Sequence, residues 1–150
     1  MNDRLMTLLA VLVVGSAVTP AVALADFSAC ASAYAAKDPQ RQIELYTSCL
    51  KRGGLMSTDV AGAFNNRGVA YEQIGETDQA LQDFASAVQY DPSWPAFRLN
   101  LARLEARKGQ CAKALADMTV VLKMGPHNKS YLETKNRMVA GCPVVSGPAN

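Results

Sequence analysis

The pattern of apolar and polar positions predicts a chain of α-helices. After residue 25, Ala, Leu, Gln, Glu, Lys and Arg dominate, and no run of β-branched residues alternates with polar ones as it would in a strand. Proline and glycine interrupt the pattern about every dozen residues and mark helix ends. The predicted helices cover residues 27–36, 39–52, the stretch from the capping residues 57–59 to 75, 77–90, 93–108, 110–124 and 129–140.

Residues 1–25 are predicted to form a cleaved signal peptide. Arg4 supplies a basic start, residues 5–14 are almost entirely apolar, and Ala23 and Ala25 put small side chains where a signal peptidase requires them. An uncleaved membrane anchor is the alternative, but the apolar stretch is shorter than the ~20 residues that a spanning helix needs. We therefore expect cleavage after Ala25 and a periplasmic or secreted protein with no membrane span.

The stretch 61–94 carries a regular pattern of small and aromatic positions. Taken as one unit, its positions 4, 8, 11, 20, 24, 27 and 32 are occupied by Phe64, Gly68, Tyr71, Ala80, Phe84, Ala87 and Pro92. This arrangement resembles the tetratricopeptide repeat, in which two antiparallel helices pack closely at small residues. A second unit of the same length follows directly at 95–128 and matches more weakly, since Arg98 and Glu105 replace the two aromatic residues of the first helix.

The resemblance covers nearly all of the chain after residue 25 and implies its organisation. It predicts a degenerate N-terminal helix pair at residues 26–60, repeats at 61–94 and 95–128, a C-terminal cap helix at 129–142 and a flexible tail at 143–150. The implied fold is all-α, a short right-handed solenoid of about three repeats plus a terminal helix. From the form of the signal segment, the chain is identified as an exported bacterial member of the family.

The resemblance also implies a concave groove lined by the first helix of each pair. Asparagine amides can hydrogen-bond an extended backbone, and arginines can bind carboxylates in bidentate geometry. We therefore expect a non-catalytic scaffold that binds an envelope protein or peptide. The predicted groove residues are Asn65, Asn66, Val69, Leu99, Asn100, Arg103, Arg107 and Arg137.

The family includes a clamp for the C-terminal carboxylates of cytosolic chaperones. It needs basic residues on the last helix, where this chain has Ser130 and Thr134 instead. We therefore do not expect that clamp, or a chaperone partner, here.

Composition argues against an enzyme. The chain has one histidine, His127, which falls in a predicted connection between helices, and no glycine-rich phosphate loop or C-x-x-C motif. The sequence therefore predicts no catalytic residue, no cofactor and no metal. A net charge of +2 is too small to indicate a nucleic-acid-binding protein. The carboxylates of the central unit are interpreted as a solvated helix face rather than an acid–base pair: Glu72, Glu76, Asp78 and Asp83.

The charges are unevenly distributed along the chain. Residues 61–94 carry one basic and five acidic side chains, whereas residues 95–142 carry nine basic and three acidic ones. This polarity could orient a partner or favour head-to-tail self-association. The alternative function is therefore a self-associating structural component of the cell envelope.

Four cysteines suggest two disulfide bonds in an exported protein. Cys111 and Cys142 lie symmetrically about the predicted turn at residues 126–127, and Cys30 and Cys49 lie symmetrically about the turn near residue 39. Antiparallel helices bring such positions together, so we predict Cys30–Cys49 and Cys111–Cys142. The alternative is four reduced, buried thiols.

Overall fold

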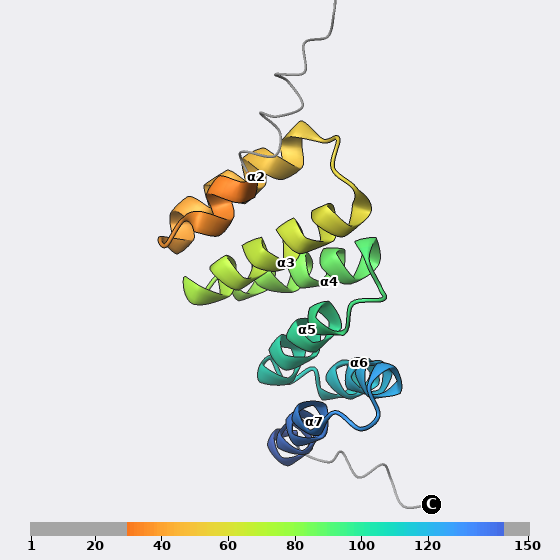
Figure 1. Ribbon diagram of the computed structural model, residues 1–150. Helices are drawn as coiled ribbons and strands as arrows, with labels where there is room; N and C mark the ends of the chain where they lie inside the picture. Colours follow the sequence, from red (N-terminus) through yellow and green to blue (C-terminus); the bar gives the residue numbers. More distant parts are fainter. Residues whose placement is uncertain (1–29, 143–150) are drawn as a thin grey trace, which may run out of the picture.

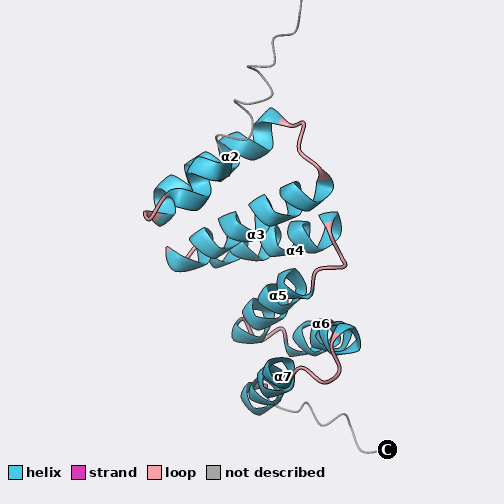
Figure 2. Cartoon of the chain, viewed as in Figure 1, coloured by secondary structure: helices cyan, strands magenta, loops and turns pink. Residues whose placement is uncertain are grey.

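The computed structural model describes residues 30–142 as a stack of α-helices that contains no strand within this range (Figures 1 and 2). Residues 30–35 are helical. Helix α2 lies at one end of the stack and α7 at the other (Figure 1), and the predicted all-α fold is confirmed. The helices are α2 (Pro39–Arg52), α3 (Ser57–Gln73), α4 (Thr77–Tyr90), α5 (Pro95–Arg107), α6 (Cys111–Met124) and α7 (Lys129–Gly141). The predicted signal peptide and flexible tail lie outside the described residues.

Local side-chain chemistry sets where several helices begin. Asp38 precedes α2 and accepts a hydrogen bond at Oδ2 from the Arg41 backbone N–H over 2.8 Å, and Pro39 follows in the first turn, where no N–H is needed. Asn128 caps α7 in the same way, because its side chain accepts from the backbone N–H groups of Ser130 and Tyr131. These starts are properties of the local sequence, and the predicted helix bounds agree closely with the observed ones. The expected capping residues at 57–59 are a wrong prediction, because α3 begins at Ser57 directly after Met56 and no side chain caps it.

Two glycines at the same position of successive units end the first helix of each pair with the same turn. Gly75 follows α3 with φ of 83°, and Gly109 follows α5 with φ of 74°. Both values lie in the left-handed region, which glycine adopts without a steric penalty. The next backbone N–H then reaches back into the helix, from Glu76 to Tyr71 and from Gln110 to Glu105, over 2.9 Å in each case. The repeat is thus visible in the backbone as well as in the side chains.

Small residues allow the two helices of the central unit to approach closely. A Cβ atom added at Gly68 of α3 would lie 2.9 Å from the Phe84 ring of α4 and 3.3 Å from the Ala80 backbone oxygen. All three residues are buried. The next helix pair repeats this packing with three fully buried residues: Ala102, Ala114 and Met118.

Disulfide bonds join helices at both ends of the stack. Cys30 is bonded to Cys49, with 5.4 Å between their Cα atoms, and Cys111 is bonded to Cys142, with 5.6 Å between theirs. These are the two pairs that the symmetry of the turns predicts.

Candidate functional site

An open groove lies between α5 and α7, at the C-terminal end of the stack. It has a volume of about 820 Å³ and combines apolar side chains with three arginines and two hydroxyl-bearing residues. None of its lining residues is acidic. The lining consists of Leu99, Arg103, Ala106, Arg107, Ser130, Thr134, Arg137, Met138, Gly141 and Cys142.

The three arginines of the groove differ in how they are held. Arg103 makes no ion pair within residues 30–142, and Arg137 makes none there either but donates a hydrogen bond to Thr134 Oγ1 over 3.3 Å. Arg107 donates to the Glu72 carboxylate of α3. Two guanidinium groups are therefore open to an incoming carboxylate, and the third is shared with Glu72.

The predicted asparagines form a hydrogen-bonded row that links α2, α3 and α5. Asn100 Nδ2 donates to Asn65 Oδ1 over 2.8 Å, and Asn65 Nδ2 donates to Asn66 Oδ1 over 3.2 Å. Asn66 Nδ2 then donates to the Tyr46 hydroxyl over 3.2 Å. Burial raises the pKa of Tyr46, with the hydrogen bond from Asn66 opposing the rise, so the phenol is neutral at the end of the row. Part of the hydrogen-bonding capacity of these amides is thus used within the fold.

The structure divides the predicted groove residues into two groups. The asparagines belong to the row, and Val69 packs, partly buried, against the core around Phe84. The other group lines the groove between α5 and α7: Leu99, Arg103, Arg107 and Arg137. The prediction missed Met138, Gly141 and Cys142, because residues of these types are most often buried and carry no signal for a groove.

A smaller pocket of about 200 Å³ lies at the N-terminal end of the stack. Its lining includes Tyr34, Tyr46, Leu55 and Asn66. Because Asn66 and Tyr46 belong to the asparagine row, the row extends from this pocket toward the arginine groove.

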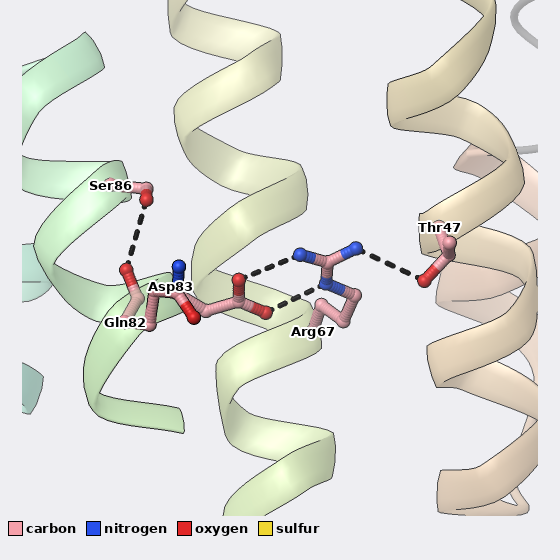
Figure 3. Close-up of polar contacts among 5 residues, drawn as sticks. All are labelled: Thr47, Arg67, Gln82, Asp83 and Ser86. Atoms are coloured by element: carbon pink, nitrogen blue, oxygen red, sulfur yellow. Dashed lines mark hydrogen bonds and ion pairs between the residues drawn. The ribbon is translucent and has the colours of Figure 1, made fainter. Parts of the chain in front are cut away.

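The interpretation of the central carboxylates as a solvated face is wrong for Asp83. Asp83 of α4 is only 3% exposed and forms a bidentate ion pair with Arg67 of α3, with both N–O distances at 2.7 Å (Figure 3). Arg67 also donates to Thr47 Oγ1 of α2 over 3.0 Å (Figure 3). The hydrogen bonds to Asp83 raise the pKa of Arg67 further. The pair stabilises the contact of three helices, and the sequence carried no signal for it because its two members lie on different helices.

Two other carboxylates of this cluster also have cationic partners. Glu72 pairs with Arg107, and Asp78 pairs with Lys108 just after α5. Each carboxylate is therefore bound to a cation from the next helix pair.

Three further features concern the histidine, possible metal ligands and possible membrane-spanning helices. His127 lies exposed in the connection between α6 and α7, as the sequence predicts. Within residues 30–142, no group of three or more His, Cys, Asp or Glu side chains is placed to hold a metal ion. None of the helices described in this range has the length and apolar character required to cross a membrane.

Solved structures of known proteins share this arrangement of helices. The second TPR domain of human RPAP3, in complex with an HSP70 peptide, has a TM-score of 0.65 at 22% identity, over 81% of this chain and 98% of that domain. The Arabidopsis OM64 TPR domain has a TM-score of 0.64 at 22% identity, over 78% of this chain and 93% of that domain. The chain has the tetratricopeptide repeat fold. No protein-family model matches the sequence.

A third similar structure is MamA, with a TM-score of 0.69 at 16% identity, over 77% of this chain and 67% of that one. At these identities the likeness concerns the fold. In this chain the groove lies between α5 and α7, at the C-terminal end of the TPR solenoid. On the last helix of this TPR array, Ser130 and Thr134 precede Arg137, and all three line the groove.

Proposed function

We propose that this protein is an exported, non-catalytic TPR scaffold that binds an acidic segment of a partner protein in the groove between α5 and α7. The observation that carries the proposal is the lining of the groove, which contains three arginines and no carboxylate. A segment with two or more carboxylates would complement this charge, and bidentate contacts would fix its position.

The arrangement of the groove supports an extended ligand. Arg103 and Arg137 lie on different helices, so neighbouring acidic side chains of one segment can reach both. Leu99, Ala106 and Met138 provide apolar surface between the charges, and the asparagine row leads away from the groove along the stack. A similar TPR domain of RPAP3 was solved with an HSP70 peptide, and the TPR2B domain of yeast Sti1 was solved as a pHsp70 complex, which supports peptide binding as the use of this fold here.

Export is part of the proposal. It is supported by the signal-like pattern of residues 1–25 and by the two disulfide bonds, because disulfides persist in oxidising compartments such as the periplasm. The partner would then be an envelope protein or peptide.

Fluorescence anisotropy with a labelled hexaglutamate peptide tests this choice of site. Replacing Arg103 or Arg137 by Ala removes a charge-assisted contact worth roughly 1.5–3 kcal/mol, so each Kd should rise roughly 10- to 150-fold. Lys135→Ala is the matched control, since Lys135 is an exposed cation of the same helix outside the groove lining, and its Kd should stay unchanged. An unchanged affinity in the double arginine variant would exclude this groove.

Two further measurements test the chemistry of the ligand. Hexaglutamine has the same length without charge and should bind at least about tenfold more weakly, because it cannot form charge-assisted hydrogen bonds. Glu72→Gln should strengthen hexaglutamate binding, because it releases Arg107 from its ion pair. Equal affinity for the two peptides would contradict an acidic ligand.

A further inference from the structure

We propose that the Cys111–Cys142 disulfide determines whether the groove is present: oxidation holds α7 in place, and reduction releases α7 and removes one wall. The consequence for ligand binding rests on the proposed function, whereas the consequence for α7 does not.

The groove depends on α7. More than half of its lining residues come from this helix and from Cys142 directly after it, including Arg137. The opposite wall, on α5, carries Arg103 and Arg107. Displacement of α7 would therefore separate Arg137 from the other two arginines.

Non-covalent contacts hold α7 less firmly than they hold α2 to α6. Its buried side chains are Thr134 and Met138, with Tyr131 partly buried beside them. Its side-chain hydrogen bonds within residues 30–142 stay in the helix and its cap, and no ion pair there connects it to another helix. An isolated helix of this length is only marginally stable in water. The folded position of α7 therefore depends on the contacts and bonds that fix it to α6.

The other neighbouring helices have polar links that α7 lacks. Arg67 connects α3 to both α2 and α4, and Arg98 of α5 pairs with Asp117 of α6 over 2.5 Å. At the α6–α7 contact, the disulfide takes the role that ion pairs and hydrogen bonds have between the other helices. In the chain-entropy model, a disulfide that closes a loop of this size shifts the equilibrium from the unfolded toward the folded loop by roughly a few hundred-fold.

Reduction of this disulfide would begin at Cys111. Cys111 is half-buried, whereas Cys142 lines the groove but is only 6% exposed, so a small dithiol would approach the sulfur of Cys111. One thiolate of the dithiol attacks a cysteine sulfur, forms a mixed disulfide and expels the other cysteine as a thiolate. The second thiol of the reductant then closes a cyclic disulfide and releases the remaining cysteine. Two electrons and two protons pass from the dithiol to the protein, which gains two thiols.

Hydrogen–deuterium exchange tests the proposal without a ligand. In Cys111→Ser/Cys142→Ser, exchange over residues 129–142 should accelerate roughly a few hundred-fold, while residues 57–90 keep their protection. Wild-type protein reduced with dithiothreitol should show the same change over 129–142. The matched control is Cys30→Ser/Cys49→Ser, which removes the other disulfide and should leave 129–142 protected. Unchanged protection of 129–142, or equal loss of protection along the whole chain, would overturn the proposal.

Binding of labelled hexaglutamate provides the second readout. The Cys111→Ser/Cys142→Ser variant should bind at least tenfold more weakly than the oxidised wild type. Release of α7 with unchanged affinity would show that the groove does not depend on the helix. If oxidised wild-type protein does not bind hexaglutamate, the proposed function fails, while the exchange result still decides the role of the disulfide.

Discussion

At the scale of single residues, the closest helix contact depends on the absence of a side chain at Gly68. Gly68→Ala would place a methyl group 2.9 Å from the Phe84 ring, which must then shift within a packed core. We expect the free energy of unfolding to fall by about 1–3 kcal/mol, despite the better helix propensity of alanine.

A neighbouring glycine supplies the control for this prediction. Gly62 lies in the same helix, and a Cβ atom there would meet nothing within 4 Å. Gly62→Ala should raise the free energy of unfolding by up to about 1 kcal/mol, because only helix propensity changes. Urea unfolding of both variants measures the difference, and an equal effect of the two substitutions would contradict the role assigned to Gly68.

Glu105 predicts a dependence of stability on pH. It is 7% exposed, and its Oε2 atom has no hydrogen-bond partner. Burial raises its pKa to about 7, the negative charge of Asp117 adds to the rise, and Lys113 opposes it. The folded state therefore holds the Glu105 proton more tightly than the unfolded state. Ionisation of Glu105 therefore lowers the free energy of unfolding progressively as pH rises from about 4.5 to about 7, and this loss is constant at higher pH.

Glu105→Gln removes the charge while keeping the shape of the side chain. At pH 8 the free energy of unfolding should exceed that of the wild type by about 1–3 kcal/mol, and the difference should shrink toward pH 4.5. Urea unfolding at several pH values measures it. A difference that does not vary with pH would show that Glu105 has an ordinary pKa.

At the scale of helices, Arg67 connects three elements through one guanidinium group. Arg67→Met would leave Asp83 buried without a counter-charge and should lower the free energy of unfolding by about 3–5 kcal/mol. Arg67→Met/Asp83→Leu removes both charges and should recover most of this loss. Urea unfolding of these two variants, of Asp83→Leu and of the wild type gives the four free energies of a double-mutant cycle for the ion pair. A double variant as unstable as Arg67→Met would show that the loss comes from Thr47 or from packing around the Phe64 and Tyr71 rings, over which Arg67 lies.

At the scale of the whole molecule, most acidic side chains of residues 61–94 are paired with cations inside the chain. Three of the five acidic side chains of residues 61–94 pair with arginine or lysine: Glu72, Asp78 and Asp83. Few free carboxylates remain there to enter the arginine groove of a second copy. The head-to-tail association that the sequence suggests thus loses most of its electrostatic basis.

We therefore expect a monomer even at low ionic strength, where charges on separate molecules are screened least. Sedimentation velocity of the oxidised protein, first in dilute buffer and then at physiological salt, tests this expectation. A dimer that dissociates as salt is added would favour the alternative of a self-associating envelope component.

The sequence alone determined the features that depend on local chemistry or on the repeat. The breaks at proline and glycine, and the small residues at Gly68 and Ala80, act over one or two helical turns or recur with a fixed period. The disulfide pairs followed in the same way, because positions symmetric about a turn meet when the two helices are antiparallel.

The tertiary structure alone decided which charged side chains meet. Arg67 and Asp83, Arg107 and Glu72, and the buried Glu105 are all polar residues on helices, and their spacing in the sequence does not distinguish a solvated carboxylate from a buried one. Long side chains reach across helix contacts, so pairing depends on the distance and angle between helices rather than on the repeat. The groove has the same origin, because Arg103 and Arg137 form one site only when α7 is packed beside α5.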